Sequence, residues 1–201
     1  MEQIEIFTQT LQDFKKFCIS QCKEAFVSNP ELLAGDILYI SAINRSLDVA
    51  ESFINATKYQ NFSVMPVLLR LQLNTLATLH YLQTHDVTGE VISKFHSGIE
   101  FRNITVPGTK NKLTDRLMVE KAALDYPWIK SVYSATSSWV HLSPTLAFTP
   151  IEVADGRLIT LRLPRLADPK FQYAVDELCE AMTACINGIQ EKIEKWARTR
   201  I

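Results

Sequence analysis

The sequence lacks an excess of either charge. Its 201 residues include 21 lysines and arginines against 22 aspartates and glutamates, which gives a formal net charge of −1 at pH 7. This balance provides no overall attraction for nucleic acid or for an anionic membrane surface. The composition, 47% hydrophobic and 21% charged, is that of an ordinary globular protein. The length suits one domain, so we expect a single helical domain over residues 1–201.

We also expect neither a targeting segment nor a membrane-spanning segment. The first residues, Met-Glu-Gln-Ile-Glu, have neither the basic region nor the apolar run of a signal peptide, so we expect a cytoplasmic protein. The most apolar stretch, residues 62–85, is long enough to span a bilayer, but Arg70, Asn74 and His80 lie within it. Because polar and charged side chains are costly in a bilayer, we expect a buried helix and no membrane contact.

Cysteine is scarce. Cys18, Cys22, Cys179 and Cys185 lie within helical patterns, so we expect four reduced thiols that pack as small apolar groups. Cys18 and Cys22 are one helical turn apart, as two metal ligands could be. However, no nearby histidine or further cysteine completes the four-ligand set of a structural zinc site. We therefore expect no metal site and no cofactor.

Apolar residues at spacings of three and four predict helices over most of the chain. The expected helices cover residues 2–27, 36–60, 62–85, about 87–98, 114–124, 127–141 and 171–196. The segment 62–85 is apolar nearly all round, which predicts the central helix. Ser63 is its expected N-cap, and His80 and His85 near its end are expected to be cap or surface groups. The fold class is mainly all-α, an up-and-down bundle of about six helices.

A change of pattern precedes the last helix. Asp155-Gly156 is a two-residue turn signal flanked by apolar residues, which predicts a small β-hairpin inserted at about residues 150–164. Gly188 lies inside the last helix, where glycine costs roughly 1 kcal/mol relative to alanine. Such a glycine is compatible with a close approach of two helices.

Polar side chains form a line along one face of each of two predicted helices, and we call these the two polar lines. Arg70, Asn74 and Thr78 are spaced at i, i+4 and i+8 on the central helix, which places them on one face. Tyr133, Ser137 and His141 have the same spacing on the helix after Pro127. The Arg70 guanidinium cannot lose its proton, so its burial requires acceptors from another element. We therefore expect the two lines to meet and to form a polar seam with a neutral His141.

Two interpretations of this seam stay open. In the functional interpretation it is open to solvent and binds an anion or a nucleotide, with Arg70 holding phosphate and His141 as the candidate acid or base. In the structural interpretation it is a buried network that fixes the register of the helices. Ser137 and His141 resemble a nucleophile and its base only loosely, because no orienting carboxylate is evident.

The segments Leu69–Asn74 and Tyr133–His141 resemble the two signature helices of a bacterial all-helical family of unknown function, which is remotely similar to HEPN domains. That family has an arginine followed at i+4 by glutamate, and then tyrosine, serine and histidine at these spacings. Asn74 occupies the position of the acid. Active HEPN domains carry an arginine and, four to six residues later, a histidine on one helix, and this chain lacks that motif. The resemblance therefore implies a helical bundle more than a nuclease.

Three hypotheses for function follow. The leading one is a HEPN-like module that binds a nucleotide, RNA or a partner protein without catalysis, through Arg70, Asn74, Tyr133, Ser137 and His141. The alternative is a metal-independent enzyme of a bacterial defence or toxin system that cleaves RNA or nucleotides, with His141 as catalytic residue. The third is a structural homo-oligomeric module, and we expect a homodimer. Whether the chain is an enzyme stays open.

Overall fold

The computed structural model describes residues 2–85, 89–140, 151–154, 158–161 and 169–200. These residues are mainly helical, which confirms the mainly α fold class. None of the described helices is long and apolar enough to cross a membrane. The elements are α1 (Glu2–Ser28), α2 (Ala34–Lys58), α3 (Met65–Thr84), α4 (Gly89–His96), the 3₁₀ helix η1 (Phe101–Asn103), α5 (Asp115–Ala122), α6 (Ile129–Val140), β1 (Ile151–Ala154), β2 (Leu158–Leu161) and α8 (Pro169–Arg198).

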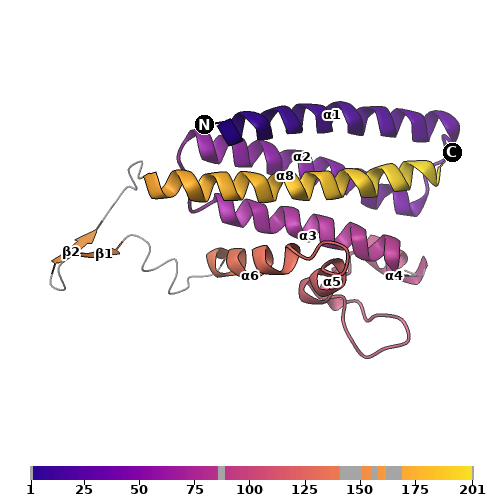
Figure 1. Ribbon diagram of the computed structural model, residues 1–201. Helices are drawn as coiled ribbons and strands as arrows, with labels where there is room; N and C mark the ends of the chain where they lie inside the picture. The colour runs from indigo at the N-terminus through magenta and orange to yellow at the C-terminus, as the bar shows by residue number, and fades with distance from the viewer. Residues whose placement is uncertain (1, 86–88, 141–150, 155–157, 162–168, 201) are drawn as a thin grey trace.

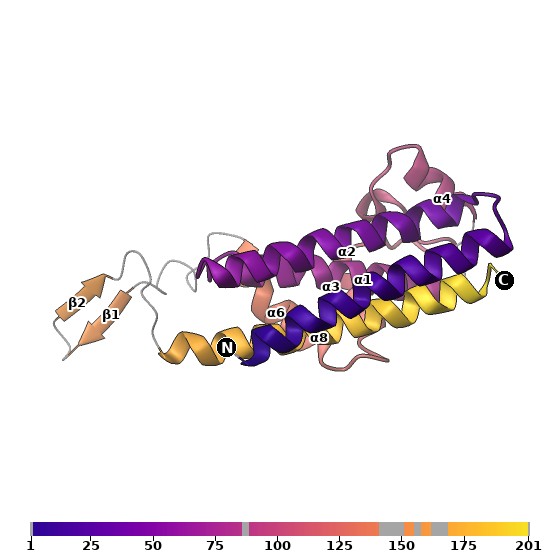
Figure 2. The ribbon, with the colours of Figure 1, turned by 90° about the horizontal axis from the view of Figure 1, so that it is seen from above.

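Four long helices form the body of the structure (Figure 1). Helices α1 and α8 lie side by side and run in the same direction, as the view from above shows (Figure 2). Helix α3 packs against α2 and α8 on one side and against α5 and α6 on the other. The prediction that residues 62–85 contain the central helix is therefore confirmed.

The core is built from the apolar faces that the spacing predicted. On α1 the residues Phe7, Leu11, Phe14 and Cys18 follow one another at three- and four-residue intervals, and all are buried. The Phe7 ring meets the ring of Phe53 on α2 edge to face, with centroids 5.4 Å apart. Burial of such aromatic side chains removes much apolar surface from water, which is the main stabilising contribution to a helical bundle.

The start of α3 differs from the expectation. Its N-cap is Val64 rather than Ser63, and no side chain caps the helix. Pro66 occupies the first turn, where the missing amide hydrogen costs nothing because no carbonyl would accept it there. A helix with a buried apolar first turn is held by packing, so it can begin without a capping hydroxyl.

Strands β1 and β2 pair antiparallel, with Ile151 opposite Leu161 and Ala154 opposite Leu158. The turn residues 155–157 lie outside the described residues, as does much of the segment 150–164. The β-hairpin as a whole therefore stays a prediction.

Candidate functional site

The structure brings the two polar lines together at Arg70 and Tyr133. Arg70 on α3 is buried, with 9% of its surface exposed. Its guanidinium carbon lies 3.3 Å from the centroid of the Tyr133 ring on α6, so the planar cation stacks on the ring face. Its Nη1 also donates a hydrogen bond to Oδ1 of Asn74, one turn along α3. The predicted partners Arg70, Asn74 and Tyr133 therefore share one cluster.

The other two predicted residues stand apart from this cluster in different ways. Ser137 lies one turn beyond Tyr133 on α6, and its hydroxyl donates 2.6 Å back to the Tyr133 carbonyl. This bond within α6 satisfies Ser137 locally, so it needs no partner on α3. His141 lies outside the described residues, and its place in the seam stays a prediction.

A carboxylate that the sequence analysis did not assign completes the cluster. Nδ2 of Asn74 lies 3.1 Å from Oδ2 of Asp115 and donates to it. Asp115 is the first residue of α5, and Thr114 before it caps that helix by accepting from the Leu117 amide. In the sequence Asp115 lay only at the start of the expected helix 114–124, because nothing in a single sequence shows that α5 begins beside α3.

The orientation of the Asn74 amide follows from its two neighbours. Arg70 offers only donors, whereas the Asp115 carboxylate offers only acceptors. The amide oxygen must therefore face Arg70, and the amide nitrogen must face Asp115. Burial lowers the pKa of Arg70 from its ordinary value of 12.5, whereas Tyr133 and Asp115 act in the opposite direction.

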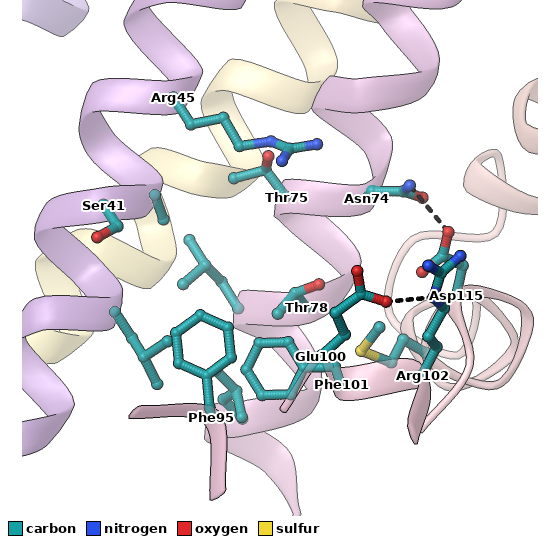
Figure 3. A pocket seen from close by; sticks show the side chains of 15 residues that line it. Ser41, Arg45, Asn74, Thr75, Thr78, Phe95, Glu100, Phe101, Arg102 and Asp115 are labelled. Atoms are coloured by element: carbon teal, nitrogen blue, oxygen red, sulfur yellow. Dashed lines mark hydrogen bonds and ion pairs between the residues drawn. The ribbon is translucent and has the colours of Figure 1, made fainter. Parts of the chain in front are cut away.

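Asn74 and Asp115 also line a cavity of about 520 Å³ between α2, α3, α4 and α5 (Figure 3). We call it the α2–α3–α5 cavity. Its volume is in the range of sites that bind small molecules. The other polar groups on its wall are Ser41, Arg45, Thr75, Thr78, Glu100 and Arg102. The polar cluster around Arg70 is thus joined to a cavity that could hold a ligand.

One wall of the cavity is aromatic. The rings of Phe95 and Phe101 stack on each other, with centroids 4.6 Å apart and an angle of 14° between the planes. Figure 3 shows both rings beside the cavity, across from Thr75. The remaining apolar lining comes from Leu38, Ala42, Leu79, Leu82 and Met118. A flat and partly apolar ligand would find a matching surface there.

The charged residues on the wall are not equivalent. Arg102 pairs with Glu100, with Nε and Oε2 2.5 Å apart, and Figure 3 shows the two side chains joined by this contact. Arg45 on α2 is exposed and has no ion pair among the residues that the structure describes. Arg45 is therefore the cation of the wall that is best placed to meet an anionic group of a ligand.

The expectation for His80 was wrong. His80 is 2% exposed, so it is neither a surface group nor a cap. Its Nε2 lies 2.7 Å from Oδ2 of Asp125, and its Nδ1 is buried with no hydrogen-bond partner within the described ranges. The edge of its ring packs on Tyr126, with centroids 5.7 Å apart. Its Nε2 is paired with the turn after α5, a contact that the helical spacing could not reveal.

Like Asp115, the cavity residues Arg45, Phe95 and Phe101 were not recognised in the sequence as candidate site residues. Phe95 lay within the expected helix at about 87–98, and Phe101 follows it after five residues, in the stretch between that helix and the expected helix 114–124. A pair of aromatic residues flanking a loop is a weak signal, because such residues are far more often part of the core. In the described part of the chain, no group of three or more histidine, cysteine, aspartate or glutamate residues is placed to hold a metal ion.

Comparison with known proteins gives no assignment for this site. No protein-family model, curated protein or solved structure matches the chain. The resemblance to HEPN-like helical domains therefore stays a prediction, and the function has to be argued from the cavity and the residues around it.

Proposed function

We propose that the chain is a helical module that binds a nucleotide in the α2–α3–α5 cavity without changing it chemically. One observation carries the proposal: the cavity combines a stacked aromatic pair, an exposed arginine that has no ion pair within the described ranges, and a fixed amide–carboxylate pair on different parts of its wall. A nucleotide has a flat base, polar groups on the edge of that base, and an anionic phosphate. Each part of such a ligand has a counterpart on this wall.

The aromatic pair supports binding of the base. Phe95 and Phe101 are both half-buried, so their rings are held by the protein while part of each ring faces the cavity. Stacking of a base on an aromatic side chain stabilises complexes by about 1–3 kcal/mol. It depends little on which base is present. The rings therefore supply affinity, and discrimination between bases has to come from the polar groups.

The phosphate is assigned to Arg45 rather than to Arg70. Arg70 is buried and engaged with Tyr133 and Asn74, so a phosphate could reach it only after those contacts had broken. Arg45 is exposed at the cavity, and a guanidinium forms paired hydrogen bonds with phosphate oxygens. This assignment changes the role of Arg70 from a phosphate ligand to a residue that supports the site.

The chemistry of the wall favours binding over catalysis. Among the described residues that line the cavity there is no histidine or cysteine. The Thr75 hydroxyl donates 3.2 Å to the Leu71 carbonyl, so it is occupied by its own helix. A general acid or base needs a group that titrates near the working pH. Histidine and cysteine are the side chains whose ordinary pKa values lie nearest to that range.

The test is titration of the purified protein with nucleoside monophosphates, with binding measured by isothermal titration calorimetry. Wild type should bind at least one of them. Phe101→Leu removes the ring but keeps an apolar side chain, and should weaken binding by roughly tenfold or more. Arg45→Met should weaken binding of the monophosphate more than binding of the free nucleoside. Arg116→Met is the control, because Arg116 is an exposed arginine of α5 that does not line the cavity.

Three results would overturn the proposal. The first is failure of every monophosphate to bind wild type at millimolar concentration. The second is binding that Phe101→Leu and Arg45→Met leave unchanged, since the ligand would then lie elsewhere. The third is recovery of hydrolysed ligand after incubation, with hydrolysis abolished in His141→Ala, which would support the enzyme hypothesis instead.

A further inference from the structure

We infer that the base read in the α2–α3–α5 cavity is guanine, and that Asp115 and Asn74 read it. This inference rests on the proposed function and adds the identity of the base. The observation behind it is the fixed orientation of the Asn74 amide between Arg70 and Asp115. Because both neighbours of the amide are defined, the pattern of donors and acceptors that the wall offers to a ligand is also defined.

The pattern consists of an acceptor pair beside a donor. Oδ2 of Asp115 accepts from Asn74, which leaves Oδ1 and the second lone pair of Oδ2 for a ligand. The Asn74 amide nitrogen carries two hydrogens, and within the described part of the chain one of them is used, by Asp115. The wall thus offers a ligand the carboxylate acceptors of Asp115 and, next to them, an N–H donor of Asn74.

Guanine is the common base that matches this order. One edge carries, in sequence, the 6-oxo acceptor, the N1–H donor and the 2-amino donor. A carboxylate can accept from N1–H and from the 2-amino group at once, while a neighbouring amide N–H donates to the 6-oxo oxygen. Adenine presents an acceptor nitrogen beside its 6-amino group. That nitrogen would face the Asp115 carboxylate with no hydrogen between them, which leaves both acceptors unsatisfied.

Arg70 acts on this edge as a positioning residue. It is buried, it stacks on Tyr133 and its Nη1 donates to Oδ1 of Asn74, so it holds the amide in the orientation that directs N–H toward the carboxylate. Without this donor the orientation of the Asn74 amide would depend on the Asp115 carboxylate alone, and the amide would be held less firmly. Arg70 therefore supports specificity without touching the ligand.

The experiment compares GMP, IMP and AMP by calorimetry on wild type and variants. IMP keeps the 6-oxo group and N1–H but lacks the 2-amino group. Wild type should prefer GMP to AMP by roughly 10- to 100-fold, the range expected for a paired polar contact to a base, with IMP between them. Asp115→Asn should remove most of that preference and leave the affinity for AMP nearly unchanged. Glu120→Gln is the matched control, since it makes the same change on α5 outside the cavity.

Arg70→Met tests the positioning role. It keeps much of the side-chain volume but removes the donor to Asn74. A purely structural role would lower the affinities for GMP and AMP alike, through loss of folded protein. The positioning role predicts a fall in the ratio of the two affinities in protein that circular dichroism shows to be folded.

The outcomes separate this inference from the proposed function. If GMP and AMP bind equally well, and Phe101→Leu weakens both, the cavity binds nucleotides but the assignment of guanine is wrong. A preference for GMP that survives in Asp115→Asn also overturns the inference, because another group must then read the base. If no monophosphate binds wild type, the proposed function fails together with the inference.

Discussion

Asp36 and Arg200, which lie near opposite ends of the sequence, form an ion pair in the interior of the protein. Oδ2 of Asp36 is 3.2 Å from Nη1 of Arg200, and the two side chains are 3% and 2% exposed. Nη2 of Arg200 also donates 2.8 Å to the Asn29 carbonyl in the α1–α2 connection. These contacts connect the end of the described chain to the start of α2 and to the α1–α2 connection. Figure 1 shows the C-terminus beside the end of α1.

The Asp36 carboxylate is the centre of this contact. Besides the guanidinium, it accepts from Trp196 Nε1 at 2.9 Å and from the Leu33 amide at 2.7 Å. Trp196 in turn stacks on Tyr39, with centroids 5.2 Å apart and planes at 9°. A buried charge is tolerated only when it is paired and hydrogen-bonded, and here one carboxylate accepts two hydrogen bonds and forms an ion pair with the Arg200 guanidinium.

Removal of this carboxylate should destabilise the fold strongly. Asp36→Ala leaves the Arg200 charge buried without a counterion, which costs about 3–5 kcal/mol in other proteins. Arg200→Met should cost less, because Asp36 keeps its bonds from Trp196 and Leu33. The free energy of unfolding in urea measures both. Asp48→Ala, an exposed acid on the same helix, is the control and should stay within about 0.5 kcal/mol of wild type. Equal stability of Asp36→Ala and wild type would contradict the structure at this point.

The sequence predicted the features that depend on one helix alone, such as which of its faces is buried. The spacing of Phe7, Leu11 and Phe14 marks the buried face of α1, because helical period and burial are both local properties. The meeting of Arg70 with Tyr133 was also predictable, since the central helix and the helix after Pro127 each carried a polar line and the Arg70 guanidinium needed a partner. The need of the Arg70 guanidinium for partners thus indicated one specific contact between two helices.

The rest of the candidate site depends on how separate elements approach one another. Asp115 reaches Asn74 because α5 begins beside α3, and Phe101 reaches the cavity through η1, in a segment that the sequence showed only as a loop. No periodicity links these positions. His80 was misjudged for the same reason, because its partner Asp125 lies in a turn 45 residues further on.

The His80–Asp125 contact should make stability depend on pH in the acid range. The hydrogen bond from His80 holds the pKa of Asp125 below its ordinary value of 3.8, and the charge of Lys192 acts in the same direction. A carboxyl group with a lowered pKa in the folded state stabilises the fold above its ordinary pKa. That contribution disappears as the pH falls through the folded-state pKa.

Asp125→Asn tests this dependence. Wild type should be the more stable protein above about pH 5, and the difference should shrink as the pH falls below about 4, where the carboxylate of wild type becomes protonated. Urea unfolding from pH 6 to pH 3 measures it, with Asp48→Asn as control for a general change of charge. A difference that is constant over the whole range would show that the Asp125 charge does not contribute.

The four cysteines should react with alkylating reagents in two classes. All four are free thiols. Burial raises the pKa of Cys18 to about 12 and that of Cys179 to about 12, and it raises the pKa of the fully buried Cys185 as well. Cys22 is half-buried, and burial also raises its pKa. Since the thiolate is the reactive form, buried thiols with raised pKa values react slowly.

Iodoacetamide at pH 8 should therefore modify Cys22 first in the folded protein. The other three should react only after denaturant is added, and mass spectrometry of proteolytic peptides can follow each site. Cys22→Ser should abolish the early modification and leave the slow class unchanged. Early labelling of Cys18, one turn away on α1, would mean that this face of α1 is open to solvent in solution.

Gly188 of α8 lies against Leu76 of α3, and this contact gives the last prediction. A β-carbon added at Gly188 would lie 2.9 Å from Cδ1 and 3.0 Å from Cδ2 of Leu76, which is itself fully buried. Overpacking of this kind costs about 1–3 kcal/mol, whereas alanine in place of glycine inside a helix contributes about 1 kcal/mol. Gly188→Ala should thus destabilise wild type by up to about 2 kcal/mol.

In a Leu76→Val background, where the shorter side chain removes the obstructing methyl groups, the same substitution should stabilise the protein. A double-mutant cycle from urea unfolding measures the coupling between the two positions. If Gly188→Ala stabilised both backgrounds equally, the glycine would not be required by the approach of the two helices.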